Sequence, residues 1–332
     1  MKHTDPNHFI GPMLMCMIFL GTSSRAFQQQ SMPVREPQDR PNELGHFLIL
    51  EYHLIQEQET RWGRSISSFR QDLERLYQSG YRPVAMGDII DGKMDLPAGK
   101  KIVVLTFDDS SPGQFRYVVK NGKREIDPDC AVGILINFHR QHPDWAKRAI
   151  FFVLPEAKQP HKLFGQPEYE ADKLKELAAN GFEIGNHTLW HADLGQYDAT
   201  IVQKQLAQSV EAVQKRVPGY AVRALALPFG VYPKDLQLAA KGTYKGISYH
   251  HEAILKVGGG AAPSPFSMSC GLLRLPRIQV LGSDLKHWIS YYEKRPGEIF
   301  VSDGNPETVT FPKALQPKFN AAKFKQLRAV AY

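Results

Sequence analysis

The sequence is poor in cysteine, which excludes the disulfide-rich scaffolds. Three cysteines stand in 332 residues, and Cys16 lies in an N-terminal segment that we expect to be removed. The other two, Cys130 and Cys270, are too few for a disulfide scaffold, and their spacing leaves open whether they pair or stay buried as thiols. The low count also argues against a zinc site built on thiolates.

Long apolar runs are absent as well. Only residues 9–21 are apolar enough to concern a membrane, and this run is shorter than the ~20 residues that span a bilayer. Small residues at Ser24 and Ala26 follow it, so we predict a secretory signal over residues 1–26, with a buried N-terminal helix as the alternative. We therefore expect an exported protein: secreted, periplasmic or associated with the cell envelope. The Gln- and Pro-rich residues 27–45 predict a linker.

Most of the chain lacks an excess of either charge. The net charge is +7, and residues 311–332 hold five basic side chains and no acidic one, so the rest is near neutral. This excludes a global nucleic-acid footprint. We expect residues 306–332 to form a basic, solvated tail, or, if functional, to contact an anionic envelope polymer or a membrane surface. The sequence does not indicate an oligomeric state.

Strand-like and helix-like segments alternate over residues 46–305 without a second composition boundary. This alternation predicts one α/β domain with a parallel sheet or barrel. Asn121-Gly122 between two β-prone halves predicts a protruding hairpin in an insertion near 110–128. The expected strands are 46–55, 100–107, 149–154, 182–186, 221–227, 246–250 and 273–280, and the expected helices are 65–80, 130–142, 170–180, 198–217, 233–241 and 284–294.

Two carboxylates follow one of these buried strands. The apolar run before Thr106 ends in Asp108 and Asp109, which places both at the carboxyl end of the strand, where parallel folds carry their active sites. Successive side chains leave a strand in opposite directions, so one Asp can bind a metal while its neighbour faces another part of the site. An Asp pair in this position is also common as a turn or a helix cap.

Two histidines follow another strand. His187 and His191 stand four residues apart in Asn186-His-Thr-Leu-Trp-His, and this spacing lets two imidazoles reach one ion. Thr188 occupies the position where a zincin would carry its catalytic Glu, so any base must come from elsewhere, and Asp108 is a candidate. One carboxylate and two imidazoles make a three-ligand site with open positions, which is typical of catalytic zinc.

These motifs resemble the polysaccharide deacetylases of carbohydrate esterase family 4, the NodB-homology domain. Residues 106–109 (TFDD) match the first motif of that family, and residues 186–191 (NHTLWH) match its H-[S/T]-x-x-H motif. Residues 227–230 (LPFG) look like a shortened form of its R-P-P-Y-G motif. The resemblance covers roughly residues 46–303.

The resemblance implies a distorted (β/α) barrel of about seven parallel strands, a divalent metal, most simply zinc, and hydrolysis of acetyl groups on amino sugars. It implies that Asp108 is the catalytic base and that Asp109, His187 and His191 are the metal ligands. Phe229 stands at the family's Tyr, whose backbone N–H helps to hold the oxyanion, and this role survives loss of the hydroxyl.

The sequence departs from the family in several places, among them Ser110, where the family has Gly after the first motif, and the long insertion that follows. Ala226 stands where the motif-three Arg would be, and Arg277 is a candidate to supply that guanidinium from a neighbouring strand. The late Leu-x-His motif, which provides the general acid, is absent. Candidate acids are His250, on a predicted strand end, and His53 at the end of the first strand, followed by His251 and His287.

The sequence thus predicts an exported, metal-dependent deacetylase that acts on an N-acetylated glycan, or less readily on an O-acetylated one. Two alternatives stay open: a non-catalytic glycan-binding protein on the same barrel, and a hydrolase of a non-sugar amide. Pro228, Trp190 and Tyr52 are candidate substrate-binding residues, the two aromatic ones by stacking on a sugar ring.

Overall fold

The computed structural model describes residues 40–332. The signal predicted over residues 1–26, and residues 27–39 of the predicted linker, lie outside the described residues. Across the described part of the chain, no helix has both the length and the apolar character to cross a membrane.

Seven parallel strands close into a barrel, which confirms the predicted fold class. Their order is β1-β14-β13-β10-β9-β8-β5, and β5 pairs back with β1. An eighth strand, β4 (Tyr81–Pro83), adds to the first half of β5. The barrel strands are β1 (Leu48–Tyr52), β5 (Lys101–Phe107), β8 (Ile150–Val153), β9 (Glu183–Asn186), β10 (Ala224–Ala226), β13 (Ala253–Gly259) and β14 (Leu275–Gln279).

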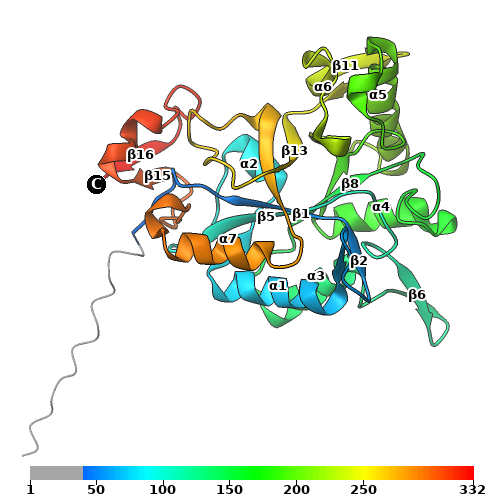
Figure 1. Cartoon of the computed structure of the whole chain (residues 1–332), viewed down its shortest axis with the longest axis horizontal. Coiled ribbons are helices and arrows are strands. Elements are labelled where there is room, and N and C mark those ends of the chain that lie inside the picture. Colours follow the sequence, from blue (N-terminus) through cyan, green and yellow to red (C-terminus); the bar gives the residue numbers. More distant parts are fainter. Residues whose placement is uncertain (1–39) are drawn as a thin grey trace, which may run out of the picture. The chain divides into compact units, whose positions relative to one another are not determined.

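Helices lie around the outside of the barrel strands (Figure 1). The sequence of the first helix accounts for its bounds. Ser65 caps its N-terminus by accepting a hydrogen bond from the Ser68 N–H at 3.1 Å. Phe69 and Leu73 bury its apolar face, and Gly80, with φ of 83°, follows its end. The helices are α1 (Ile66–Gln78), α2 (Met86–Asp91), α3 (Ala131–Gln141), α4 (Glu170–Ala179), α5 (Ala199–Arg216), α6 (Gln237–Ala240) and α7 (Asp284–Glu293).

Strand alternation divides the apolar core into an inner and an outer part. On β5, Val103 and Leu105 share a cluster with the buried residues of α1 and α3, whereas Ile102 and Val104 belong to a second cluster, which also contains the buried residues of α2. Each such side chain contributes roughly 1.5–3 kcal/mol by leaving water. The same alternation directs Asp108 toward the barrel axis, so a carboxylate enters the interior at the end of an apolar strand.

One predicted strand forms but lies outside the barrel. Residues 246–250 form β12 (Ile247–His250), which pairs antiparallel with β11 (Lys241–Tyr244) outside the barrel. Two turn residues with φ of 49° and 80° close this hairpin, and only one residue of β12 is buried. The barrel strand is the next one, β13, which begins with three fully buried apolar residues.

Two further strand pairs extend from the carboxyl end of the barrel. β2 (Leu54–Gln56) pairs with β3 (Gly63–Ser65) directly after β1. β6 (Tyr117–Lys120) and β7 (Lys123–Ile126) form the hairpin of the insertion, with φ of 52° and 71° at its Asn-Gly turn. Figure 1 shows this hairpin reaching away from the body of the domain.

The basic C-terminal segment is folded, unlike the solvated tail that its charge suggested. β15 (Thr308–Phe311) pairs in parallel with β16 (Arg328–Ala331). Phe311 and Phe324 are buried and join the inner core cluster. Apolar residues spaced among the lysines therefore decide the structure of this segment, and its basic groups stay on the surface.

The last residues assigned to the linker also belong to the domain. Asn42 and Val301 exchange two backbone hydrogen bonds of 2.9 and 3.0 Å. Glu43 is buried, and its carboxylate accepts the N–H groups of Thr310 at 2.7 Å and Asp303 at 3.4 Å. Burial raises the pKa of Glu43 to about 8, against the opposing effect of these two hydrogen bonds.

Glu43 should make the stability of the domain depend on pH. Because its folded pKa lies above the ordinary value of 4.5, its stabilising effect is present below about pH 4.5 and is lost as the pH rises through about 8. We expect the melting temperature of Glu43→Gln to fall less between about pH 5 and pH 8 than that of the wild type. Glu307→Gln, at an exposed carboxylate, is the control. Equal falls in all three proteins would contradict this assignment.

Candidate active site

The carboxyl ends of the barrel strands gather the polar residues that the sequence singled out. Asp108 and Asp109 follow β5, His187 follows β9, Phe229 follows β10, and His53 follows β1. In a parallel barrel these ends lie at the same rim, where loops can combine side chains from distant parts of the chain.

Three side chains at this rim converge on one point. Asp109 Oδ1 lies 3.3 Å from His187 Nε2 and 3.5 Å from His191 Nε2. All three candidate ligand atoms lie within 4.8 Å of one another. The backbone adopts positive φ at Asp109 (76°), Thr188 (69°) and His191 (67°), a strain typical of functional sites.

The donor set fits a divalent cation. His187 Nδ1 lies 2.8 Å from the Ala226 carbonyl oxygen, and donation of its proton there leaves a lone pair on Nε2, the atom that faces Asp109. Asp109 Oδ1 is itself buried without a hydrogen bond of good geometry. Two imidazole nitrogens and a carboxylate oxygen are ligands that zinc binds in catalytic sites.

Local charges set the protonation of these groups. Burial alone would raise the pKa of Asp109, but the contact with protonated His187 holds that pKa well below its usual range. Burial, together with the positive charge of His187, lowers the pKa of His191 to about 4. Asp109 is therefore an anion and His191 a neutral imidazole at neutral pH, which are the forms that bind a metal. Burial would lower the pKa of His187, but the carboxylates of Asp108 and Asp109 outweigh it and raise that pKa, so binding of an ion would displace the His187 proton.

Asp108 lies beside this cluster in a fork-shaped ion pair. Arg277, fully buried on β14, donates to Asp108 Oδ1 at 2.8 Å and to Oδ2 at 2.7 Å. Burial would raise the pKa of Asp108, but the guanidinium outweighs it and keeps the pKa below the ordinary value. Asp108 Oδ2 is 3.9 Å from His187 Nε2, so an ionised carboxylate borders the candidate metal site.

A second buried carboxylate, Glu51, was missed in the sequence. Its Oε1 lies 3.5 Å from Arg277 and 3.6 Å from His53 Nε2, and it makes no hydrogen bond there. Burial raises the pKa of Glu51, against the positive charge of Arg277. The sequence could have indicated this residue, because Glu51 is the only charged residue in the apolar strand β1, and a buried carboxylate needs a charged or hydrogen-bonding partner.

A pocket of about 410 Å³ opens above these groups; we call it the active-site pocket. Asp109, His191 and His53 line it, and so do two exposed aromatic residues, Trp62 and Phe229. The φ of Phe229 is 59°, and its ring lies 4.6 Å from that of His191. The other residues that line the pocket are Glu51, Leu54, His161, Val257 and Gln279.

The family model for polysaccharide deacetylase matches residues 145–247, a stretch that includes both histidines of the cluster. This match covers less than half of the chain. It is 29% identical over 87 residues to a chitooligosaccharide deacetylase of Sinorhizobium fredii, and 27% identical over 95 residues to one of Rhizobium leguminosarum. These matches cover 25% and 27% of this chain, and only 40% and 42% of those proteins.

Two solved structures share the barrel fold of this domain. The Streptococcus pyogenes deacetylase PplD, solved in complex with acetate, aligns with a TM-score of 0.56 at 22% identity, over 76% of this chain and 98% of that one. IcaB from Ammonifex degensii aligns with a TM-score of 0.52 at 18% identity, over 74% and 97% of the two chains. At these identities the likeness concerns the fold.

Two histidine candidates lie away from the active-site pocket. His250 is exposed on β12 and precedes β13, so it stands before the amino end of a barrel strand and not at the carboxyl rim. The error follows from the misplaced strand described above. His287 lies on α7, with its ring 6.1 Å from that of Trp288.

Two aromatic candidates also lack a place in this pocket. Tyr52 is buried on the outer side of β1, where its hydroxyl donates to Asp72 at 3.3 Å. Trp190 is partly exposed under the Lys204 ammonium and does not line the pocket. Trp62, which the sequence analysis did not select, is the tryptophan that lines it. Pro228, the other predicted substrate-binding residue, precedes Phe229 in its turn, but it is buried and does not line the pocket.

His251 contacts Asn186, which precedes the loop that carries His187 and His191. It is fully buried; its Nδ1 lies 2.8 Å from the Ala239 carbonyl oxygen, and its Nε2 lies 3.1 Å from the Asn186 amide nitrogen. The Asn186 Oδ1 in turn accepts the N–H of Thr188 at 2.8 Å. His251 thereby fixes which way the Asn186 amide points, and that amide shapes the loop between His187 and its partner ligand.

Replacing His251 should therefore weaken metal binding without touching a candidate ligand. We expect His251→Phe, which keeps a ring but loses the acceptor, to reduce divalent-ion affinity by roughly 10–100-fold. His251→Gln, whose side-chain oxygen can accept from Asn186, should recover part of the loss. Competition with a chelator measures the affinity. Unchanged affinity in the Phe variant would contradict the role of this contact.

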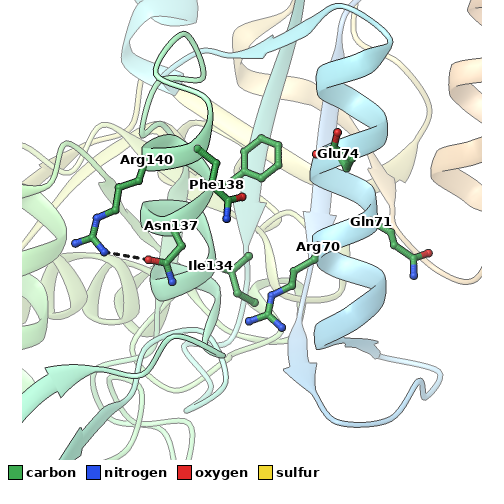
Figure 2. A pocket seen from close by; sticks show the side chains of 8 residues that line it. Arg70, Gln71, Glu74, Ile134, Asn137, Phe138 and Arg140 are labelled. Atoms are coloured by element: carbon green, nitrogen blue, oxygen red, sulfur yellow. Dashed lines mark hydrogen bonds between the residues drawn. The ribbon is translucent and has the colours of Figure 1, made fainter. Parts of the chain in front are cut away.

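A separate hollow of about 630 Å³ lies between α1 and α3, outside the barrel. Figure 2 shows Arg70 and Glu74 on one helix and Asn137 and Arg140 on the other, with Arg140 hydrogen-bonded to Asn137. The cluster of Asp109, His187 and His191 includes no residue of this hollow. Asp109, His191 and His53 line the smaller active-site pocket instead.

Proposed function

We propose that this chain is a metal-dependent hydrolase that removes acetyl groups from an N-acetylated glycan, and less readily from an O-acetylated one. The observation that carries the proposal is the position of the Arg277-bound Asp108 beside the cluster of Asp109, His187 and His191. An ionised base next to a three-ligand site with open positions is the arrangement that metal-assisted amide hydrolysis needs. The predicted signal over residues 1–26 supports export, so the proposed substrate is an envelope or extracellular glycan.

Asp109, His187 and His191 would hold the ion, most simply Zn²⁺. When bound there, a zinc ion acidifies a water molecule and polarises the acetyl carbonyl. Asp108 accepts a proton as the water attacks, and Arg277 keeps this carboxylate ionised and oriented. The Phe229 N–H donates to the carbonyl oxygen as that oxygen gains negative charge.

The leaving amine needs a proton, and we assign its donor to His53 in place of His250. His53 lines the active-site pocket together with Asp109 and His191, and its Nε2 lies 3.6 Å from the buried Glu51. This contact with Glu51 can orient the imidazole at the wall of the pocket. His53 and Asp108 thus supply the acid and the base from neighbouring strands, because β1 and β5 pair directly.

This assignment predicts a substrate-dependent loss of activity. His53→Gln should slow acetate release from an amide by about 10²–10⁴-fold, and should slow hydrolysis of an activated acetyl ester much less, because a good leaving group needs little protonation. His250→Gln serves as the matched control and should change neither rate. Equal losses on amide and ester in His53→Gln would assign this residue to positioning and contradict its role as the acid.

The function itself is tested by acetate release from a panel of N-acetylated and O-acetylated oligosaccharides and acetylated non-sugar amides. The proposal expects release from the N-acetylated sugars at the highest kcat/KM. Release from the non-sugar amides alone would show that the substrate is a non-sugar amide and not a glycan. Oligosaccharide binding with no release from any compound would make the chain a glycan-binding protein.

A further inference from the structure

Lys173 is a fully buried lysine on α4 that the proposed reaction does not use. Its ammonium donates hydrogen bonds to the carbonyl oxygens of Phe164 and Gly165, each at 2.9 Å. It lies over the Phe115 ring, 6.0 Å from the ring centroid, and it forms no ion pair with a carboxylate among residues 40–332. Burying an ammonium without a counter-ion is costly, so the two carbonyl groups are the feature that accounts for its position.

The groups around Lys173 leave it a cation at neutral pH. Burial lowers the pKa of Lys173 to about 8, Arg116 lowers it further, and the carboxylates of Glu168 and Glu170 act against this lowering. The neighbouring Cys130 supplies no negative charge at neutral pH, because burial raises the pKa of its thiol to about 11. The hydrogen bonds to the two carbonyl oxygens are therefore charge-assisted, which makes them stronger than bonds from a neutral donor.

The carbonyl groups that Lys173 binds belong to a strained segment of backbone. Four consecutive residues have positive φ: Leu163 (44°), Phe164 (69°), Gly165 (63°) and Gln166 (52°). Residues other than glycine adopt this conformation at a cost, and they keep it only where the surrounding structure holds them. The Gln166 side chain holds the end of the segment through two hydrogen bonds of 2.9 Å with the backbone of Tyr117. Lys173 holds its middle.

The same segment contacts the backbone of the candidate metal ligand Asp109. The Phe164 N–H donates to the Ser110 carbonyl oxygen at 2.8 Å, and the Ser110 hydroxyl donates to the His161 carbonyl oxygen at 2.7 Å. His161 Nδ1 lies 3.3 Å from the carbonyl oxygen of Asp109. Asp109 and Ser110 themselves have φ of 76° and 42°, so their backbone also needs support from its surroundings. A continuous set of contacts thus joins Lys173 to Asp109.

We propose, on the basis of the function proposed above, that Lys173 is a positioning residue of the active site. Its ammonium holds residues 161–166 in their left-handed conformation, and these residues hold Asp109 where it can share an ion with His187 and His191. Lys173 does not line the active-site pocket, so it acts only through the backbone between them. This role accounts for a buried ammonium that has carbonyl groups in place of a counter-ion.

The affinity for Zn²⁺, measured by competition with a chelator, tests this proposal. Lys173→Met keeps an unbranched apolar side chain but loses every donor, and we expect it to weaken Zn²⁺ binding by roughly tenfold, the lower end of the range for contacts that orient a ligand. At saturating Zn²⁺, kcat for acetate release should fall while KM stays within about twofold, because the substrate contacts are intact. Lys173→Arg, which keeps a charged donor, should recover part of both losses.

A matched control and a coupled variant separate positioning from general stability. Arg82 on β4 is also a buried cation, and it donates to the carbonyl oxygens of Tyr77 at 3.2 Å and Tyr81 at 2.7 Å. Arg82→Met should lower the melting temperature and leave Zn²⁺ affinity unchanged. Ser110→Ala breaks the contacts between Lys173 and Asp109 at their other end. The double variant of Lys173→Met and Ser110→Ala should therefore lose no more affinity than the weaker-binding single variant, whereas independent effects would multiply.

The outcomes separate this proposal from the function on which it rests. Unchanged Zn²⁺ affinity and kcat in folded Lys173→Met would overturn the positioning role and leave the deacetylase intact, and so would losses that multiply in the double variant. If the wild type releases no acetate, the Zn²⁺ affinities still decide. If it binds no Zn²⁺, hydrogen exchange of peptides spanning residues 109–110 and 161–166 decides: faster exchange of both in Lys173→Met supports the proposal, and unchanged exchange at 109–110 overturns it. Should Lys173→Met not fold, Lys173→Gln takes its place in each comparison.

Discussion

Replacing Asp108 by asparagine should lower acetate release by about 10²–10⁴-fold, or more, while the protein keeps its metal. The amide has the shape of the carboxylate but cannot accept the proton of the attacking water. Both terminal nitrogens of Arg277 bind Asp108, which holds this side chain in place. The measurement is kcat/KM for acetate release, with metal content determined on the same sample.

The loss of a buried ion pair could itself disturb the fold, so the comparison needs a matched aspartate. Asp72 is fully buried and forms the same kind of fork with Arg64, at 2.8 and 2.7 Å, on the helix side of the barrel. Asp72→Asn removes an equivalent pair away from the pocket. We expect it to lower stability and to leave kcat/KM within a few-fold of the wild type. Normal turnover in Asp108→Asn would eliminate this residue as the base.

Replacing His187 by alanine should abolish stoichiometric binding of a divalent ion. The substitution removes the most buried of the three candidate ligands, the one whose Nε2 lies 3.3 Å from Asp109. Two ligands would remain, which is below the three that hold a catalytic zinc ion. Metal analysis after dialysis, together with chelator competition, gives the stoichiometry and the affinity.

His139 provides the control for this experiment. Its Nδ1 also contacts a backbone carbonyl, that of Trp145 at 2.7 Å, but it lies on α3 outside the barrel. His139→Ala should keep one equivalent of metal. Full occupancy in His187→Ala, with the melting curve unchanged, would show that the ion binds elsewhere.

Much of the fold could be predicted from sequence because the strands are apolar and the helices amphipathic. The exception at residues 246–250 has a physical cause: a β-prone segment pairs as well with a neighbouring hairpin strand as with a barrel strand, and periodicity does not distinguish the two. The prediction of a solvated tail over residues 306–332 was wrong for a different reason. Its charge was given more weight than Phe311 and Phe324, which bury against the domain.

Only those site residues that belong to short continuous sequence motifs could be predicted. The motif residues Asp108, Asp109, His187 and His191 come from two short segments, and the structure brings them together. Arg277 and Glu51 reach Asp108 from other strands, through a register that only the closed barrel defines. The supporting residues therefore depend on pairing partners distant in sequence.

The measurement that tests the central claim most directly is acetate release from an N-acetylated oligosaccharide before chelation, after complete removal of metal, and after addition of one equivalent of Zn²⁺. The account predicts release by the metal-loaded protein, loss of release on chelation, and recovery on addition of the ion to the wild type but not to His187→Ala. Acetate release that persists in protein shown by metal analysis to hold no ion would contradict it.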